Sequence, residues 1–100
     1  MNNEQKPDSA WGDGWVRHEW SDEEVAAAVA YLKKRIPREW AELEQLEIQS
    51  GDLTGAPAAD IEMGALSVEY KNRFDHRDII ELRGMVRAAR RRALGIAIEG

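Results

Sequence analysis

The chain has 100 residues, no cysteine and a formal net charge of −5. This length supports one domain with one modest core, and the lack of cysteine excludes a disulfide framework and a thiolate metal site. With 43% hydrophobic and 33% charged residues, and no apolar run near the roughly 20 residues that cross a bilayer, we expect a soluble protein. The first residues are polar and show no signal-peptide pattern, so we expect it to stay in the cytosol or in an assembly made there.

Residues 1–20 are predicted to form a flexible arm. The segment is polar and contains Pro7, Gly12 and Gly14, which oppose regular structure. It also carries large indole rings, which are seldom left in water and are enriched among interface anchors. We therefore predict that the indoles dock onto another protein, with folding back onto the chain's own core as the alternative. The tryptophans concerned are Trp11, Trp15 and Trp20.

A long first helix is predicted over residues 21–50. Ser21 and Glu24 form a capping box, and apolar residues then recur every three or four positions. Pro37 conflicts with this pattern, so either the helix kinks or it ends and a second helix starts with the proline in its first turn. Because the apolar stripe keeps its phase across the proline, we favour one kinked helix that ends before Gly51, a residue typical of a helix C-terminus.

A short β-hairpin is predicted over residues 60–71. After a loop that contains glycine and proline, apolar and polar residues alternate on both sides of Gly64. Apolar residues such as Ile61 on the first strand and Val68 on the second would line one face. Since a hairpin alone is marginal in water, this face should rest on the helices.

A second helix is predicted over residues 76–94. Asp75 caps its start, apolar residues follow at helical spacing, and Gly95 ends it. The last turns are rich in arginine, which suits the negative end of the helix dipole. Residues 96–100 form a tail that alternates apolar and polar residues. In a single chain we expect this tail to be frayed, but it could add to a neighbouring protein as a short strand. Its partner-binding residues would be Ile96 and Ile98.

The predicted fold class is therefore α+β. Two amphipathic helices pack on a short β-hairpin in a single domain over residues 21–95, with a flexible N-terminal arm and a C-terminal tail. The charge is uneven, because residues 1–65 have a net charge of −8 and residues 66–100 a net charge of +3. The two ends should have different electrostatic partners, unless they are simply two solvated helix faces.

No catalytic, metal-binding or cofactor-binding motif is found. His76, Arg77 and Asp78 match the start of a kinase catalytic loop, but Arg83 stands where that motif needs asparagine. His18 and His76 have no partner at a spacing typical of a metal site, and no glycine-rich phosphate loop follows a strand. We expect a protein that is not an enzyme and needs no cofactor.

The arginine-rich end of the second helix is the one feature that could contact nucleic acid. Its four arginines spread around the helix axis, so at most two or three could address one phosphate backbone. The alternatives are a solvated helix end or salt bridges to an acidic neighbour. The net acidic chain would repel DNA elsewhere. The candidate DNA-facing residues are Arg87, Arg90, Arg91 and Arg92.

The order of helix, glycine-containing loop, short hairpin and basic-ended helix resembles the head-to-tail joining proteins of tailed bacteriophages, the family of phage lambda's head-completion protein W. The matching stretch is residues 61–92. It contains an apolar–Glu–aromatic strand at residues 68–70 (VEY) and a capped helix that opens with residues 78–79 (DI). The longer first helix, the interruption at Pro37 and the tryptophan-bearing arm depart from the family pattern.

The resemblance implies a structural virion protein of the phage neck, assembled in the bacterial host cytoplasm. Such a protein would form a homo-oligomeric ring, a dodecamer, beneath the portal protein and provide the platform for the next neck or tail protein. The tryptophans would anchor neighbouring subunits, while the arginines would face an acidic partner or contact packaged DNA non-specifically. The alternative function is a small regulatory nucleic-acid-binding protein, such as an antitoxin or repressor, whose binding would fall steeply with salt.

Overall fold

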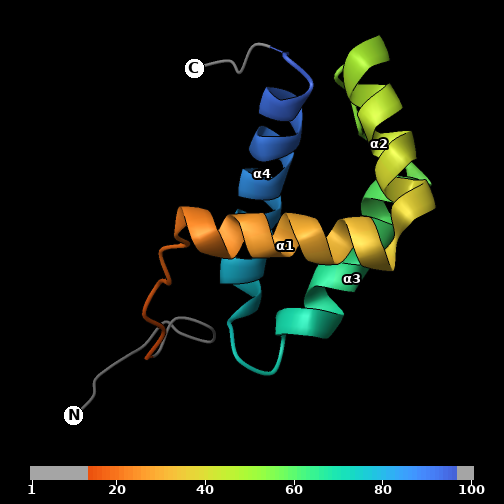
Figure 1. Cartoon of the computed structure of the whole chain (residues 1–100). Helices are drawn as coiled ribbons and strands as arrows, with labels where there is room; N and C mark the ends of the chain where they lie inside the picture. The colour runs from red at the N-terminus through yellow and green to blue at the C-terminus, as the bar shows by residue number, and fades with distance from the viewer. Residues whose placement is uncertain (1–13, 97–100) are drawn as a thin grey trace.

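A computed structural model describes residues 14–96, and this part of the chain contains four α-helices and no β-strand (Figure 1). The predicted α+β fold is therefore wrong, and the described chain is all-helical. The first predicted helix, residues 21–50, corresponds to two helices of the structure, and the second, residues 76–94, corresponds to one. The remaining helix, residues 57–70, stands where the hairpin was predicted. The helices are α1 (Asp22–Arg35), α2 (Pro37–Gln49), α3 (Pro57–Tyr70) and α4 (His76–Ala93).

α1 begins at the capping box that the sequence predicted. The Ser21 hydroxyl accepts the Glu24 N–H at 3.1 Å, and the Glu24 carboxylate accepts the Ser21 N–H at 2.8 Å. Three acidic residues in the first turn and three basic residues in the last turn both complement the helix dipole. The side of α1 that faces the core carries Val25, Ala28 and Leu32.

The chain changes direction between α1 and α2 at Ile36, whose φ is −133° and ψ 61°. Pro37 stands in the first turn of α2, where its missing N–H removes no bond within the helix. One kinked helix over residues 21–50 is thus wrong, and the alternative of a second helix starting at the proline is confirmed. Gly51 follows α2 with a φ of +72° and donates its N–H to the Leu46 carbonyl at 2.9 Å, as predicted for the helix end.

The residues predicted as a hairpin, 60–71, belong almost entirely to α3. Pro57 in the first turn starts this helix. Gly64, expected at the hairpin turn, lies on the exposed side of the helix with open space around it, and Ile61 and Val68 are exposed on the same side. The buried side repeats at helical spacing and carries Ala58, Ala59, Glu62 and Leu66.

α4 begins and ends close to where the sequence placed it. The Asp75 carboxylate accepts the Arg77 N–H at 2.9 Å and caps the helix. Gly95 follows the last turn with a φ of +76°, a backbone conformation that favours glycine. The prediction of a helix over residues 76–94 is confirmed.

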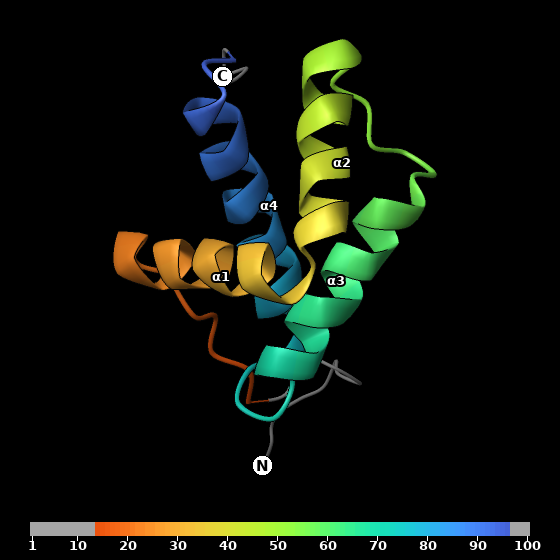
Figure 2. The same ribbon diagram turned by 45° about the vertical axis from the view of Figure 1, so that its right-hand side comes forward.

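The four helices pack as two pairs. α1 crosses α4 and packs mainly on it, whereas α2 runs back along α3 (Figures 1 and 2). α4 also packs on α3 and, more sparsely, on α2. In this arrangement each of the four helices, α4 included, contacts the other three.

The apolar core has two parts. The larger part joins all four helices around the fully buried side chains of Leu32, Leu66 and Leu82. The smaller part lies where α2, α3 and the loop between them meet, and it consists of Leu43, Leu53, Ala58 and Ala59. Buried charged side chains also lie between α2, α3 and α4, and they form part of the candidate site.

The residues before α1 are held against the start of α4 by Asp78. Its carboxylate accepts the Trp15 indole N–H at 3.2 Å and the His18 backbone N–H at 3.0 Å, and its carbonyl accepts the Trp20 indole N–H at 2.9 Å. Trp20 is buried in the larger core. The described part of the predicted arm, residues 14–20, therefore packs on the helices.

Candidate functional site

Three charged side chains from three helices are buried together, and we call them the ion triad: Glu47 of α2, Glu62 of α3 and Arg90 of α4. They are 3%, 0% and 1% exposed. Arg90 donates to Glu62 Oε2 at 2.6 Å and to Glu47 Oε2 at 3.2 and 3.3 Å. Its guanidinium also lies 4.9 Å from the ring centroid of Trp40. Because an unpaired buried charge costs several kcal/mol, these contacts are what allow charge in the interior.

Two further arginines of α4 bind Glu47 from the solvent side. Arg87 donates to both carboxylate oxygens at 2.9 and 3.0 Å and to the Gly51 carbonyl, and Arg91 donates to Oε1 at 2.8 Å. Burial acts to raise the pKa of Glu47. The hydrogen bonds and positive charges of these arginines outweigh burial and hold that pKa below its ordinary value.

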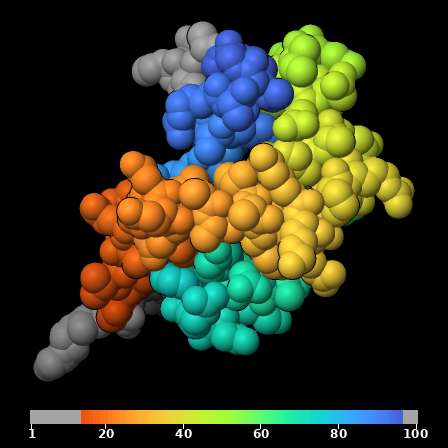
Figure 3. All heavy atoms as spheres, viewed as in Figure 1, coloured from red at the N-terminus to blue at the C-terminus, as the bar shows by residue number. Residues whose placement is uncertain are grey.

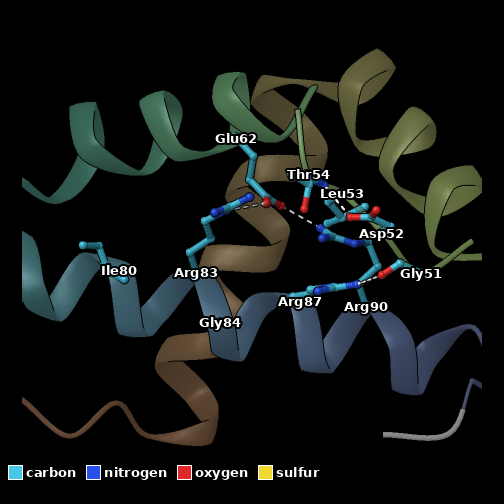
Figure 4. A pocket seen from close by; sticks show the side chains of 10 residues that line it. All are labelled: Gly51, Asp52, Leu53, Thr54, Glu62, Ile80, Arg83, Gly84, Arg87 and Arg90. Carbon is cyan, nitrogen blue, oxygen red and sulfur yellow. Dashed lines mark hydrogen bonds and ion pairs between the residues drawn. The ribbon is translucent and has the colours of Figure 1, made fainter. Parts of the chain in front are cut away.

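A hollow of about 380 Å³ opens beside the ion triad, between α3, α4 and residues 51–54. We call it the arginine cleft. Figure 4 shows α4 as one wall, with Arg83 and Arg87 reaching toward Glu62 and the loop on the other side. It is lined by Gly51, Asp52, Leu53, Thr54, Glu62, Ile80, Arg83, Gly84, Arg87 and Arg90.

Arg83 is the cleft arginine with the fewest contacts. Within the described residues its one hydrogen bond or ion pair joins Nε to Glu62 Oε1 at 3.4 Å, and its side chain is 34% exposed. Its remaining N–H donors have no protein acceptor there. Ile80, three residues earlier on α4, is 52% exposed. A guanidinium with open donors thus stands beside an exposed apolar side chain.

Counted together with Arg91, which binds Glu47 beside them, the cleft and the ion triad hold more positive than negative charge. Four guanidiniums of α4 meet two buried carboxylates, and the exposed Asp52 adds a third negative charge at the rim. One positive charge is left over among these described groups. An anionic group that entered the cleft would therefore meet a favourable field. The four guanidiniums belong to Arg83, Arg87, Arg90 and Arg91.

The arginines predicted to face DNA occupy different environments. Arg90 is buried, Arg87 and Arg91 bind Glu47, and Arg92 is exposed. For three of the four, the structure matches the alternative of salt bridges to an acidic neighbour. That neighbour is in the same chain.

The tryptophans predicted to bind a partner are used within the chain where they are described. Trp15 is partly buried, and the Arg77 guanidinium lies 3.9 Å from its ring centroid. Trp20 is buried, which leaves its indole no surface for a partner. The folding-back alternative describes both rings. Trp11 lies outside the described residues.

Of the two tail residues predicted to bind a partner, one lies within the described residues and one lies outside them. Ile96 is partly buried after α4, and its N–H donates to the Arg91 carbonyl at 2.9 Å. Ile98 lies outside the described residues. The predicted tryptophan, arginine and tail residues that are described do not form one continuous site.

Sequence reasoning missed the acidic half of the site and Arg83. The signal was present, because Glu47 continues the buried row of Trp40 and Leu43 at helical spacing. Glu62 likewise lies three and four residues from buried positions of α3. A glutamate in phase with an apolar stripe indicates a buried carboxylate that needs an arginine.

Other site chemistry and the comparisons with known proteins add nothing to this site. Among the described residues, no group of three or more His, Cys, Asp or Glu side chains could hold a metal ion. None of the described helices has the length and apolar character that spanning a membrane requires. Comparison of the chain with protein-family models, with curated proteins and with solved structures found no match.

Proposed function

We propose that this chain is a non-catalytic protein-binding subunit whose arginine cleft holds an acidic side chain of its partner. The observation that carries the proposal is the pairing of Arg83, which has open donors, with the exposed Ile80. A carboxylate can accept two parallel bonds from one guanidinium, and a neighbouring apolar side chain of the partner would cover the isoleucine. Arginine and large apolar side chains are frequent anchors of protein interfaces.

A single carboxylate suits the cleft better than a nucleic-acid backbone does. Arg90 is buried and Arg87 already pairs with Glu47, so few guanidiniums remain for a row of phosphates. Asp52 at the rim and the net charge of −5 would repel a polyanion. The small excess of positive charge in the cleft is enough for one anionic side chain.

The phage-neck role is the finer form of this proposal. It would make the chain a virion subunit that forms a ring beneath a portal protein and binds the next neck or tail protein. It comes from the resemblance of residues 61–92 to the phage joining proteins, and residues 61–70 are helical where that resemblance implies a hairpin. The protein-binding proposal therefore rests on the arginine cleft and not on the resemblance. The neck role has a separate test, which is whether the chain co-assembles with a portal protein, measured as the mass of the complex.

The cleft can be tested with a short acidic peptide, acetyl-Glu-Leu-amide, and its neutral counterpart, acetyl-Gln-Leu-amide. In a two-dimensional NMR titration, we expect only the acidic peptide to shift the amide signals of residues 51–54 and 80–90. Arg83→Gln should weaken this binding about tenfold or more, because a charge-assisted hydrogen bond is lost. The exposed Arg73, which pairs with Glu69 away from the cleft, provides the control variant Arg73→Gln.

Three results would overturn the proposal. The first is equal binding of the neutral and acidic peptides, and the second is binding that Arg83→Gln leaves unchanged. The third is a 20-base-pair DNA duplex that binds through residues 80–90 with a steep salt dependence while neither peptide binds, which would favour the nucleic-acid alternative.

A further inference from the structure

A second hollow, separate from the arginine cleft, lies between α1 and α4. Its volume is about 490 Å³, and we call it the α1–α4 groove. Figure 3 shows α1 running across this face, with the C-terminal half of α4 standing beyond it. Its centre is apolar and consists mostly of small side chains: Val25, Ala26, Met85, Ala88 and Ala89.

The two walls of the α1–α4 groove end in opposite charges. Asp22 stands in the first turn of α1, and Arg92 stands in the last turn of α4. Both are exposed, and neither side chain makes a hydrogen bond or ion pair within the described residues. The groove thus combines an acidic end, an apolar centre and a basic end.

We propose that the α1–α4 groove is the contact face of a symmetric dimer of this chain. An isologous interface needs a surface that is complementary to itself. Rotation about a two-fold axis that crosses the groove centre would place Asp22 of each copy opposite Arg92 of the other. The Asp22–Arg92 pair would then form twice in one dimer, which is the feature that selects a second copy as the occupant.

The apolar centre fits the same arrangement. Met85 is an exposed large side chain of α4, and alanines from both helices line the same groove. In the dimer, Met85 of one copy would pack into the alanine-lined hollow of the other, a contact that the flexible thioether side chain accommodates well. The inference goes beyond the proposed function, because it concerns a different face and a partner that is the chain itself.

Charge reversal tests the two-fold pairing directly. We would measure the molar mass by sedimentation equilibrium from about 10 µM to about 1 mM, a range suited to weak association. The wild-type chain should dimerise with rising concentration. Asp22→Arg alone and Arg92→Asp alone should each weaken the dimer about tenfold or more, because each creates two like-charge contacts. The double variant should return to within about threefold of the wild type, since the pairs are restored with exchanged signs.

The double variant also separates dimerisation from monomer stability. Both reversals oppose the helix dipole, so the double variant should have the least stable monomer of the set. Recovery of the dimer in that variant cannot come from a better fold. Urea unfolding of each variant would report the monomer stability.

A steric pair of variants tests the position of the interface. Ala26 lines the groove, whereas Ala27 is exposed on α1 outside the groove lining. Ala26→Trp should abolish dimerisation and Ala27→Trp should leave it intact. The proposal is wrong if the wild-type chain stays monomeric up to about 1 mM. It is equally wrong if both single reversals leave the dimer unchanged, or if Ala27→Trp rather than Ala26→Trp disrupts it.

Discussion

Arg90 stands where the spacing of α4 calls for an apolar residue. It continues the buried row of Ile79, Leu82 and Val86, and it is as buried as they are. Buried ion pairs add little net stability compared with well-packed apolar side chains, but a charge that loses its partner is costly. We interpret the ion triad as a device that fixes how α2, α3 and α4 align.

The interpretation predicts the outcome of two substitutions. Arg90→Met should lower the free energy of unfolding by about 3–5 kcal/mol, because it leaves Glu62 buried with only the long contact to Arg83. Adding Glu62→Met should recover most of this loss, since the uncompensated charge is then gone. Urea denaturation of both variants measures the effect. A double variant as unstable as Arg90→Met alone would contradict the interpretation.

At the residue scale, the sequence predicted the caps well and the site poorly. Ser21 and Asp75 are recognised as caps because their partners lie two or three residues away in the chain. Glu62 is not recognised as buried, because its partner Arg90 lies 28 residues away. The arginine cleft depends on such distant pairs, so local patterns could not predict it.

At the element scale, α3 shows how two periodicities compete for the same residues. The segment around Ile61 and Glu62 alternates apolar and polar residues, which is typical of a strand. It is also compatible with a helix whose buried side contains the glutamate and whose exposed side contains Ile61. The second arrangement needs a partner for the buried carboxylate, and the pairing with Arg90 that supplies it exists only in the folded chain.

The break at Pro37 was ambiguous for a different reason. The apolar stripe continues in phase from α1 into α2, so it is compatible both with one kinked helix and with two separate helices. Proline suits the first turn of a helix and disrupts an interior, and the structure uses the first arrangement. The non-helical geometry at Ile36 then turns α2 away from α1.

The capping box of α1 predicts a modest and local effect. Ser21→Ala should lower the free energy of unfolding by about 1 kcal/mol, because the first-turn N–H of Glu24 loses its acceptor. Urea denaturation measures the change. Ser67 on α3 provides the control, since its hydroxyl makes no hydrogen bond within the described residues. Ser67→Ala should change stability by less than about 0.5 kcal/mol, and an equal loss in both variants would argue against the cap.

At the scale of the whole molecule, much of the uneven charge along the sequence is paired by contacts between helices of the same chain. α4 carries six arginines and two acidic residues, and it packs against α2 and α3, in which acidic residues outnumber basic ones. The contacts of Glu47 and Glu62 with α4 follow from this arrangement. The basic end of the chain therefore finds much of its electrostatic partner in the preceding helices.

The same pairing predicts that acid weakens the fold. Hydrogen bonds from Arg77 lower the pKa of Asp75 to about 2, and the arginines around Glu47 hold its pKa below 4.5 despite burial. Because these pKa values are lower in the folded than in the unfolded chain, the unfolded chain takes up protons first. The stabilisation is complete above about pH 4.5 and is lost as the pH falls toward about 2.

Urea midpoints measured at pH 7, 4.5, 3.5 and 2.5 would check this prediction. We expect a small change from pH 7 to 4.5 and a steep fall below it. Glu47→Gln should show a shallower fall from its own neutral-pH value, since one of the titrating groups is absent. A wild-type midpoint that stays constant down to pH 2.5 would contradict the prediction.

α4 is also the last of the four helices to be synthesised, and it contacts each of the others. Until it leaves the ribosome, Glu47 and Glu62 have no guanidinium to bind, and Trp20 has no Asp78 to hold it. The ion triad and the larger part of the core can therefore be completed only when α4 is available. Products of interrupted translation that lack α4 should leave these buried carboxylates without Arg90 and part of the core uncovered, which favours their recognition by chaperones and proteases.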